Sequence, residues 1–466
     1  MCRLIQSAVC ALALLCISTE AKEKPRLNFI FILADDLGWT GLGCYGSPFY
    51  ETPNIDRLAR EGMRFTQAYA AAPLCSPTRA SFLTGKYPAR LHVTDYIPGE
   101  KFPNAKLLPP PDWSKRLPAG ETTIAQRLKA AGYVTASIGK WHLGGPEARP
   151  EHFGFDFSVA GIPRGSPASY FSPYKNAYLK DGPPGEFLSD RLTDETIKFI
   201  EANKDKPFFI YLPHFAVHTP IRAKADVTEK YQKKKNSGSL HTNAVYAALT
   251  ESVDDSVGRI MKELDELKLA DRTVVVFNSD NGGMIKVTSN SPLRSGKASP
   301  YEGGVRVPLI VRWAGVTRQG SLCDAPVITA DFYPTILEMA EVQDATDHVS
   351  DGESLVPLLK QDGGLKRKEI FWHYPHYNNG NAGQATPFSA IRCGDFRLVQ
   401  FLEDDRVELY DLKKDIGETK NLASAMPETA NDLKTKLDRW RKEVGAQLPI
   451  PNAAYDPKKG GEKGTP

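Results

Sequence analysis

The feature that most constrains the fold of this chain is a series of apolar runs that alternate with segments of helical spacing. The run Leu27–Ala34 (LNFIFILA) is almost unbroken, which predicts a central strand buried on both faces. Strands that alternate with helices predict an α/β fold with a large mixed, mostly parallel sheet sandwiched by helices. Further strands are predicted at 133–138, 207–212, 273–277 and 307–313, and helices at 122–131, 190–203 and 243–267.

The pattern changes after about Ala340, where short apolar runs are separated by turn residues. This change predicts a smaller C-terminal α+β subdomain that carries an antiparallel sheet. We therefore expect a main domain over 25–345, the subdomain over 346–450, and a disordered tail over 451–466, which is rich in Gly, Lys and Pro. The subdomain strands are predicted at 369–374, 389–392, 396–401 and 407–412, and its helix at 427–444.

Residues 1–21 have the pattern of a secretory signal peptide. Arg3 supplies a positive start, residues 8–17 are apolar, and Thr19–Ala21 offers a cleavage site. We expect an exported protein, periplasmic or extracellular, and the lack of an Asn-x-Ser/Thr sequence favours a bacterial source. No later run is long enough to predict a transmembrane segment. The net charge of +3 gives no general case for nucleic acid binding. The sequence leaves the oligomeric state open.

Polar motifs follow four of the predicted strands at the point where each strand ends. Ligands in open α/β sheets bind outside the carboxyl ends of the strands, so these motifs are expected to meet at one edge. Asp35 and Asp36 follow one strand, and Asp280 and Asn281 follow another. Their oxygen atoms suit a hard cation, calcium or magnesium, better than zinc. The alternative, an Asp pair that only caps a turn, does not explain the second pair.

The segment Cys75-Ser76-Pro77-Thr78-Arg79 places a nucleophile where a helix can begin, since proline suits the first helical turn. The free N–H groups of that turn, with Arg79, are expected to attract an anion. Lys140 and His142 follow a second strand on an extended segment that should point both side chains the same way. A cation, a nucleophile and an anion site together suit hydrolysis of a sulfate or phosphate ester. His218 adds a further proton carrier. Lys297 adds positive charge and lies on a loop that is expected to be mobile without ligand.

These motifs, C-S-P-T-R, G-K-W-H-L-G, H-x-x-x-H-T-P and S-D-N-G in this order, resemble type I sulfatases of the alkaline phosphatase superfamily. The resemblance covers about 27–315 and implies that Cys75 is oxidised to formylglycine by a formylglycine-generating or anaerobic maturation enzyme. It also implies one calcium ion held by Asp35, Asp36, Asp280, Asn281 and residue 75. The catalytic residues implied are Cys75, Arg79, Lys140, His142, His218 and Lys297, with His142 and His218 moving protons.

The substrate expected from export and from the resemblance is a sulfated sugar or polysaccharide. Candidate sugar contacts are His92 and Asp95, together with His373, His376 and Asn378 in the segment 373–381 of the subdomain. The alternative is that these residues belong to a surface loop that has no role in substrate specificity. Two rival functions stay open: a phosphoester or phosphonate monoester hydrolase of the same superfamily, and a non-catalytic protein that binds sulfated glycans.

Overall fold

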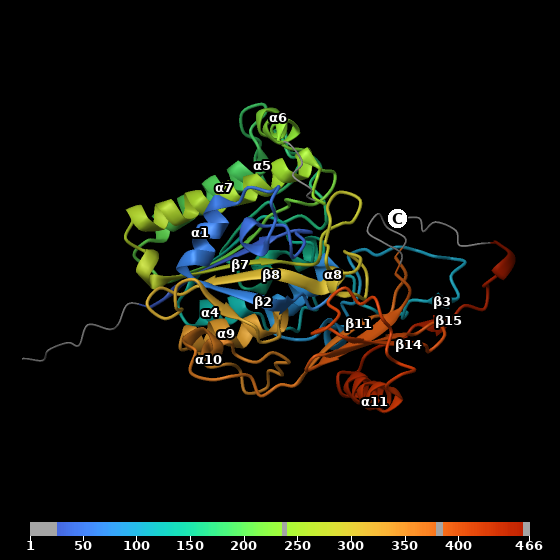
Figure 1. The fold of residues 1–466 in the computed structure, drawn as a ribbon. Coiled ribbons are helices and arrows are strands. Elements are labelled where there is room, and N and C mark those ends of the chain that lie inside the picture. Colours follow the sequence, from blue (N-terminus) through green and yellow to red (C-terminus); the bar gives the residue numbers. More distant parts are fainter. Residues whose placement is uncertain (1–25, 235–239, 379–384, 460–466) are drawn as a thin grey trace, which may run out of the picture.

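The computed structural model describes residues 26–234, 240–378 and 385–459 (Figure 1). The predicted signal peptide at 1–21 lies outside the described residues, as do 379–381 of the candidate sugar-binding segment and 460–466 of the predicted tail.

A large sheet forms the centre of the described chain. Its strands follow the order β10-β2-β8-β7-β1-β6-β4-β5, with β9 also beside β2. All neighbouring pairs are parallel except those of β8, which runs antiparallel to both β2 and β7. The predicted mostly parallel sheet is therefore confirmed. Its strands are β1 (Asn28–Ala34), β2 (Met63–Tyr69), β4 (Val134–Ile138), β5 (Phe157–Val159), β6 (Phe208–Pro213), β7 (Thr273–Ser279), β8 (Arg306–Arg312), β9 (Ser321–Cys323) and β10 (Val327–Ile328).

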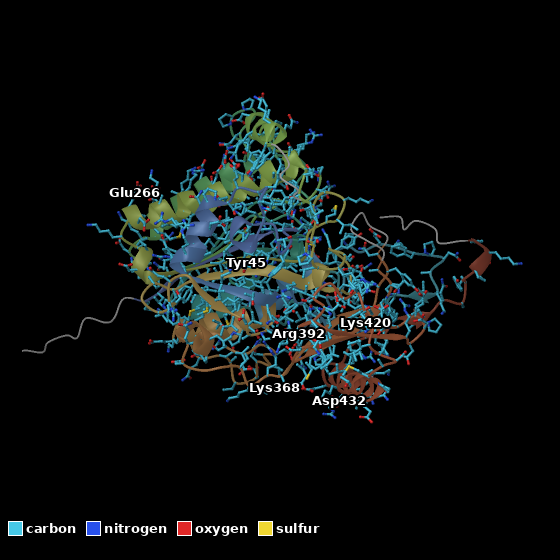
Figure 2. All side chains as sticks on the ribbon, in the orientation of Figure 1. Tyr45, Glu266, Lys368, Arg392, Lys420 and Asp432 are labelled. Atoms are coloured by element: carbon cyan, nitrogen blue, oxygen red, sulfur yellow. The ribbon has the colours of Figure 1, made fainter. Side chains whose placement is uncertain are left out.

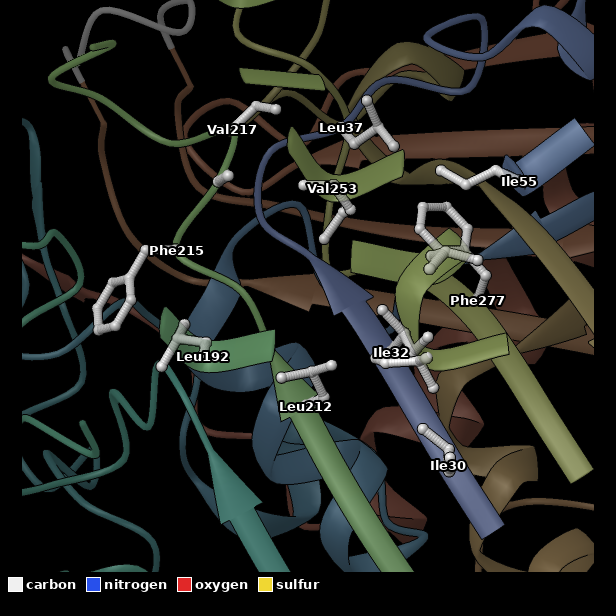
Figure 3. Close-up of a cluster of buried hydrophobic side chains, with 14 of the residues drawn as sticks. Ile30, Ile32, Leu37, Ile55, Leu192, Leu212, Phe215, Val217, Val253 and Phe277 are labelled. Carbon is white, nitrogen blue, oxygen red and sulfur yellow. The ribbon is translucent and has the colours of Figure 1, made fainter. Parts of the chain in front are cut away.

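Helices cover both faces of this sheet, and alternate side chains of β1 supply the two cores. Ile30 and Ile32 pack with α1 (Pro53–Glu61), α5 (Leu188–Asn203) and α7 (Ala244–Glu266) on one face (Figure 3). Phe29 and Phe31 pack toward the other face. The helices there are α2 (Cys75–Thr84), α4 (Ile124–Ala130), α9 (Phe332–Met339) and α10 (Val356–Lys360). Burial on both faces explains why β1 reads as a continuous apolar run.

A second, antiparallel sheet lies beside the edge of the main body and confirms the predicted subdomain architecture (Figure 1). Arg392 of this sheet hydrogen bonds to the Tyr69 hydroxyl of β2, and the Trp372 indole donates to the Ala70 carbonyl at 2.8 Å. Figure 2 shows Arg392 at this junction, whereas Glu266, Lys368 and Asp432 extend toward solvent. The sheet contains β11 (Glu369–Tyr374), β12 (Phe388–Cys393), β13 (Phe396–Phe401) and β14 (Val407–Asp411), and α11 (Pro427–Glu443) packs on it.

The start of the predicted tail is ordered, contrary to expectation. Strand β15 (Ile450–Pro451) pairs antiparallel with β3 (Leu107–Leu108), and Asn452 donates to the Ala105 carbonyl at 2.7 Å. The composition of a segment does not indicate whether it pairs with a distant segment of the chain. The other connecting helices are α3 (Pro88–Leu91), α6 (Ala225–Lys233) and α8 (Glu302–Val305). Short 3-10 turns lie at Gly43–Tyr45, Pro146–Ala148, Pro150–Phe153, Ala270–Arg272, Thr329–Asp331 and Pro457–Lys459.

Cys44, Cys75, Cys323 and Cys393 are free thiols. Within the three described ranges, no helix combines the length and apolar character needed to cross a membrane.

Candidate active site

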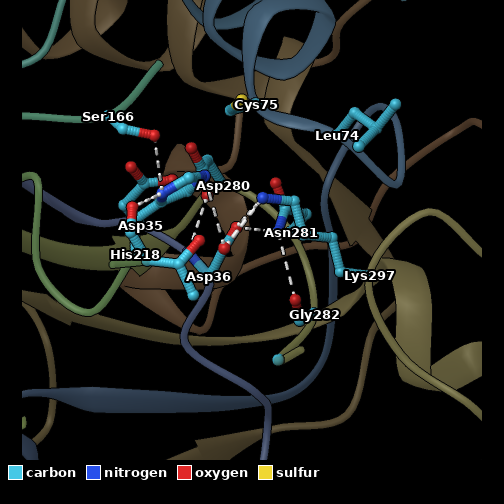
Figure 4. Close-up of polar contacts among 12 residues, drawn as sticks. Asp35, Asp36, Leu74, Cys75, Ser166, His218, Asp280, Asn281, Gly282 and Lys297 are labelled. Atoms are coloured by element: carbon cyan, nitrogen blue, oxygen red, sulfur yellow. Dashed lines mark hydrogen bonds and ion pairs between the residues drawn. The ribbon is translucent and has the colours of Figure 1, made fainter. Parts of the chain in front are cut away.

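The carboxyl ends of β1 and β7 bring four oxygen-bearing side chains together (Figure 4). The two strands pair in parallel through Ala34 and Ser279, so the residues that follow them leave the sheet side by side. The Asp36 amide donates to Asp280 Oδ1 at 3.2 Å, and Asn281 Nδ2 donates to Asp36 Oδ1 at 2.8 Å. Asp35, Asp36, Asp280 and Asn281 are all buried.

This group fits a hard cation. Asp35 Oδ1 and Asn281 Oδ1 are buried and have no hydrogen-bond partner among the described residues. Ligand atoms of Asp35, Cys75 and Asp280 all lie within 4.8 Å of one another. Unsatisfied buried oxygens are costly, and a cation that binds them removes that cost. The donor set, oxygen atoms beside residue 75, is the one that calcium or magnesium prefers.

Three basic side chains balance the three carboxylates of the site. Lys140 Nζ lies 2.5 Å from Asp35, Lys297 Nζ lies 2.7 Å from Asp36, and Arg79 Nη2 lies 2.7 Å from Asp280. Burial acts to raise the pKa of Asp36, but Lys297 and His218 hold that pKa below its ordinary value. A divalent cation bound at this group would add positive charge, which would favour an anionic ester.

Cys75 is the first residue of α2, as the proline in the first turn predicted. Its Sγ lies 3.2 Å from His142 Nδ1, while His142 Nε2 lies 2.7 Å from the Ile97 carbonyl. The Nε2–H therefore donates to Ile97, which leaves Nδ1 as an acceptor that faces residue 75. Burial and then Lys140 lower the pKa of His142, so its ring is neutral. Burial raises the pKa of the Cys75 thiol, which disfavours a thiolate nucleophile.

His218 faces the carboxylates from the segment after β6. Its Nδ1 lies 2.6 Å from the Thr219 carbonyl, so Nδ1–H donates there, and its Nε2 lies 3.7 Å from Asp36 Oδ2. Burial and the Lys297 charge lower the pKa of His218 to about 3. The Lys297 loop, expected to be mobile, is held by two backbone bonds, from Lys297 to the Gly283 carbonyl and from Ala298 to the Pro73 carbonyl.

A cavity of about 690 Å³ opens onto Cys75, His142, His218 and Lys297. Asn378 is the one candidate sugar contact that lines it. The remaining wall is mostly apolar, with one acidic and one basic side chain. It consists of Leu74, Tyr96, Ile97, Pro98, Glu100, Pro163, Arg164, Gly165, Ser166, Pro167, Ala168, Thr219, Met284 and Ala298.

Two predicted anion-binding residues face the carboxylates instead of the cavity. Arg79 is fully buried and donates to Asp280 through Nε at 3.0 Å and to the Lys140 carbonyl through Nη1 at 2.9 Å. Lys140 is likewise buried against Asp35. The extended segment predicted for Lys140 and His142 is also wrong, because β4 ends at Ile138 and His142 has a φ of 57°. The two side chains consequently reach different partners.

Four of the predicted sugar contacts lie outside the cavity wall. His92 Nε2 bonds to the Gly445 carbonyl at 3.0 Å, and His373 is buried with its two ring nitrogens bonded to Ser389 and Gln447. His376 is buried, and its Nε2 lies 2.8 Å from the Thr94 hydroxyl. Asp95 is buried as well. These placements give the four residues structural partners at the junction with the subdomain, and they do not support direct sugar contact.

The burial of Asp95 leads to a pH-dependent prediction. Burial raises the pKa of this carboxyl to about 8 from its ordinary 3.8, although Tyr96 N–H and the Tyr374 hydroxyl donate to Oδ1. The unfolded chain loses this proton near its ordinary pKa while the native state retains it, so stability falls as pH rises from about 4 to about 8. Asp95→Asn cannot ionise. We expect its melting temperature to exceed that of the wild type at pH 8 and to differ little at pH 4. If the melting temperatures of variant and wild type differ by the same amount at pH 4 and pH 8, this account is contradicted.

The segment 163–168 is a continuous part of the cavity wall that the sequence motifs did not predict. It follows β5 as the loop sequence PRGSPA, which carries no motif. A Cβ built on Gly165 lies 2.5 Å from His142 Cε1, and the Ser166 hydroxyl lies 3.3 Å from His218 Nδ1. The segment therefore touches both histidines of the site, and Figure 4 shows the contact between Ser166 and His218. The glycine and the two prolines were the only features of this segment that could have indicated a loop with a defined conformation.

Gly165→Ala tests whether this contact sets the His142 ring. The ring is fixed between Ile97 and Cys75, so a methyl group 2.5 Å from Cε1 must displace it. We expect kcat to fall between about tenfold and a hundredfold, because small misplacements of reacting groups have effects of this size. Steady-state kinetics and a melting curve measure this. Gly120→Ala is the matched control, since nothing lies within 4 Å of its added Cβ. Equal kcat in the two variants would remove the positioning role.

Comparisons with known proteins show which proteins this chain resembles. The family description "Sulfatase" matches residues 27–342, and "N-sulphoglucosamine sulphohydrolase, C-terminal" matches 296–443. A "Sulfatase" of Formosa agariphila is 34% identical over 90% of this chain and 89% of its own. Human N-acetylgalactosamine-6-sulfatase is 34% identical over 76% of this chain and 69% of its own. The crystal structure of Ps i-CgsB in complex with k-i-k-neocarrahexaose has a TM-score of 0.77 and 26% identity, covering 94% of this chain and 96% of that one.

Proposed function

The chain belongs to the sulfatase family and is a sulfuric ester hydrolase, and we propose that it is exported and removes sulfate from a sulfated sugar or polysaccharide. The observation that carries the proposal is that Cys75, His142 and Lys297 line one cavity. Three buried carboxylates, paired with Lys297, Lys140 and Arg79, lie next to them. Esters of sulfuric acid are anions, and this site combines charge for binding them with a group that accepts a proton beside residue 75.

We propose that a maturation enzyme converts Cys75 to formylglycine and that one calcium ion binds to Asp35, Asp36, Asp280, Asn281 and residue 75. The raised pKa of the thiol supports the modification, because an unmodified Cys75 is a poor nucleophile here. The unsatisfied oxygens of Asp35 and Asn281 support the ion. Hydrated formylglycine supplies a hydroxyl nucleophile, and calcium supplies a Lewis acid that stabilises charge on the sulfate oxygens.

The side chains of the site are proposed to divide binding and proton transfer. Lys297 lines the cavity and keeps its charge beside Asp36, so it can hold a sulfate oxygen. Lys140 and Arg79 hold Asp35 and Asp280 in place and add positive charge behind them. His142 accepts a proton at Nδ1 from residue 75.

His218 is proposed to protonate the departing alcohol from Nε2. The Thr219 carbonyl fixes Nδ1 as the donor of the neutral ring, so Nε2 is the atom that gains and loses the catalytic proton. A bound anionic ester favours the protonated ring, which offsets the effect of burial and of Lys297.

The carbohydrate assignment rests on relatives and on the cavity. N-acetylgalactosamine-6-sulfatase is named for a sugar, and Ps i-CgsB was crystallised with a hexaose. The cavity adds Asn378 and Glu100, whose amide and carboxylate can bond sugar hydroxyls. Residues 1–21 support export to the periplasm or the medium of a bacterial cell.

Two measurements test this function against its rivals. The protein is produced with a maturation enzyme, and mass analysis of the peptide that contains residue 75 measures conversion. Release of sulfate from an aryl sulfate is then compared with release of phosphate from the matching aryl phosphate. We expect conversion and a strong preference for the sulfate. Preference for phosphate or phosphonate would make the protein a hydrolase of those esters. Unmodified cysteine in the native protein, without turnover, would favour the glycan-binding protein.

A panel of defined sulfated saccharides identifies the sugar and the sulfated position. Chain-end and internal sulfates are placed on otherwise identical oligosaccharides, and released sulfate is quantified by ion chromatography. Turnover of the aryl ester without turnover of any saccharide contradicts the carbohydrate assignment while leaving the sulfatase assignment intact.

A further inference from the structure

The cavity contains a basic side chain that the proposed reaction does not use. Arg164 lines the same cavity as Cys75, Lys297 and His218, and it is exposed to solvent. Lys297 is paired with Asp36, whereas the described residues provide no hydrogen bond or ion pair for the Arg164 guanidinium. Arg164 is therefore a cation of the cavity wall that is available to a ligand.

The position of Arg164 is fixed close to the reacting groups. Its neighbour Gly165 lies against the His142 ring, and Ser166 contacts His218. Adjacent Cα atoms lie about 3.8 Å apart, so the Arg164 Cα lies at about that distance from the Cα of Gly165, the residue that contacts His142. Pro163 and Pro167 restrict the backbone on both sides, which reduces the entropy lost when the loop binds a ligand.

The acidic residue of the cavity wall hydrogen bonds to another residue of the same wall, not to Arg164. The Glu100 side chain hydrogen bonds to Tyr96, which lies on the segment that precedes it. The lining residues next to Arg164 in the chain include Pro163, Pro167 and Ala168, so this part of the wall is partly apolar. A ligand that covers Arg164 and displaces water would strengthen its interaction with the guanidinium. A guanidinium also matches the planar fork of a carboxylate and the oxygens of a sulfate.

We propose that Arg164 forms an anion subsite that selects substrates with a second negative group near the ester that is cleaved. This inference rests on the proposed function and deepens it: the substrate is a sulfated saccharide that also carries a uronic carboxylate or a second sulfate. Those two sources share the chemistry that Arg164 recognises, and the substrates of the test separate them.

The test measures selectivity with the full-length protein converted at residue 75. Three saccharides of the same backbone are used: one with a single sulfate, one with a second sulfate, and one with a uronic carboxylate in place of that second sulfate. Selectivity is the kcat/KM of each doubly charged substrate divided by that of the singly sulfated one. Wild type is compared with Arg164→Gln and Arg164→Lys. Arg259→Gln is the matched control, since Arg259 is an exposed arginine paired with Asp194 on the outer face of the molecule.

We expect selectivity for one of the doubly charged substrates to fall about tenfold in Arg164→Gln, the size typical of a hydrogen bond between charged groups. Arg164→Lys is expected to recover part of it, and Arg259→Gln to match the wild type. The substrate that loses selectivity identifies the anion as sulfate or carboxylate. Unchanged selectivity for both substrates in Arg164→Gln overturns the subsite. Melting curves exclude misfolding, and absence of sulfate release by converted wild type would instead overturn the proposed function.

Discussion

Cys75→Ala is expected to abolish sulfate release, with turnover reduced by about four orders of magnitude or more, because it removes the proposed nucleophile. Cys75 is buried at the start of α2, with its Sγ beside His142. Removing one sulfur atom leaves the backbone and the carboxylate network in place, so the fold should be retained. Sulfate release is measured with an aryl sulfate, and circular dichroism and a melting curve report on the fold.

The control for this variant is Cys44→Ala, which removes a thiol that lies outside the site. It should retain wild-type activity. Mass analysis must first show that the wild-type sample is converted at position 75. An unconverted sample is expected to have no activity with which the variant can be compared. Substantial turnover by Cys75→Ala, with conversion of the wild type verified, would show that the nucleophile lies elsewhere.

Asp280→Asn is expected to lose bound metal and activity together. Asp280 Oδ2 accepts from Arg79 Nε and Nη2, at 3.0 and 2.7 Å, and Oδ1 accepts from the Asp36 amide. The asparagine amide has a similar shape but carries no charge, and it has only one oxygen that can accept hydrogen bonds or bind a metal ion. Loss of residues that merely support metal ligands costs about 10- to 100-fold, so loss of a ligand should lower activity more than about a hundredfold. Metal content is measured by elemental analysis after incubation with calcium and removal of excess ion.

A melting curve gives a readout that does not depend on activity. Calcium that binds only the native state raises the melting temperature of the wild type, and Asp280→Asn should show no such rise. Asp280→Ala should also be less stable without calcium, by about 3–5 kcal/mol, because it leaves the buried Arg79 without its partner. Asp254→Asn, which changes a buried carboxylate bonded to Asn54 and Ile55, is the matched control. Calcium retained by Asp280→Asn would exclude Asp280 as a ligand.

The elements that position the site could be predicted from the sequence because their signals are local. The run that became β1 is apolar throughout, since a strand buried on both faces tolerates little else. Helix α7 begins after Asn243, whose side chain accepts from two backbone amides of the first turn, and such caps are visible in the sequence. The meeting of the β1 and β7 aspartates followed from strand direction alone, because parallel strands end at the same edge.

Other parts of the site depend on contacts between distant segments. Nothing near Arg79 in the sequence indicates that its guanidinium bonds Asp280, which lies 201 residues away. The reversed direction of β8 depends on its pairing with both β2 and β7. The order of residues 450–452 depends on pairing with the segment around Leu107.

Residue type and strand direction are local properties, so the sequence was enough to predict the α/β architecture and the gathering of acidic and basic groups at the strand ends, and to propose residue 75 as the nucleophile. Only the folded chain shows which basic side chains pair with the carboxylates. It also shows that His92 and His373 bond to main-chain carbonyls, and that the loop with Arg164 and Gly165 forms part of the cavity wall. Those outcomes depend on packing between segments far apart in the chain, and the orientation of a side chain is set by the neighbours that packing supplies.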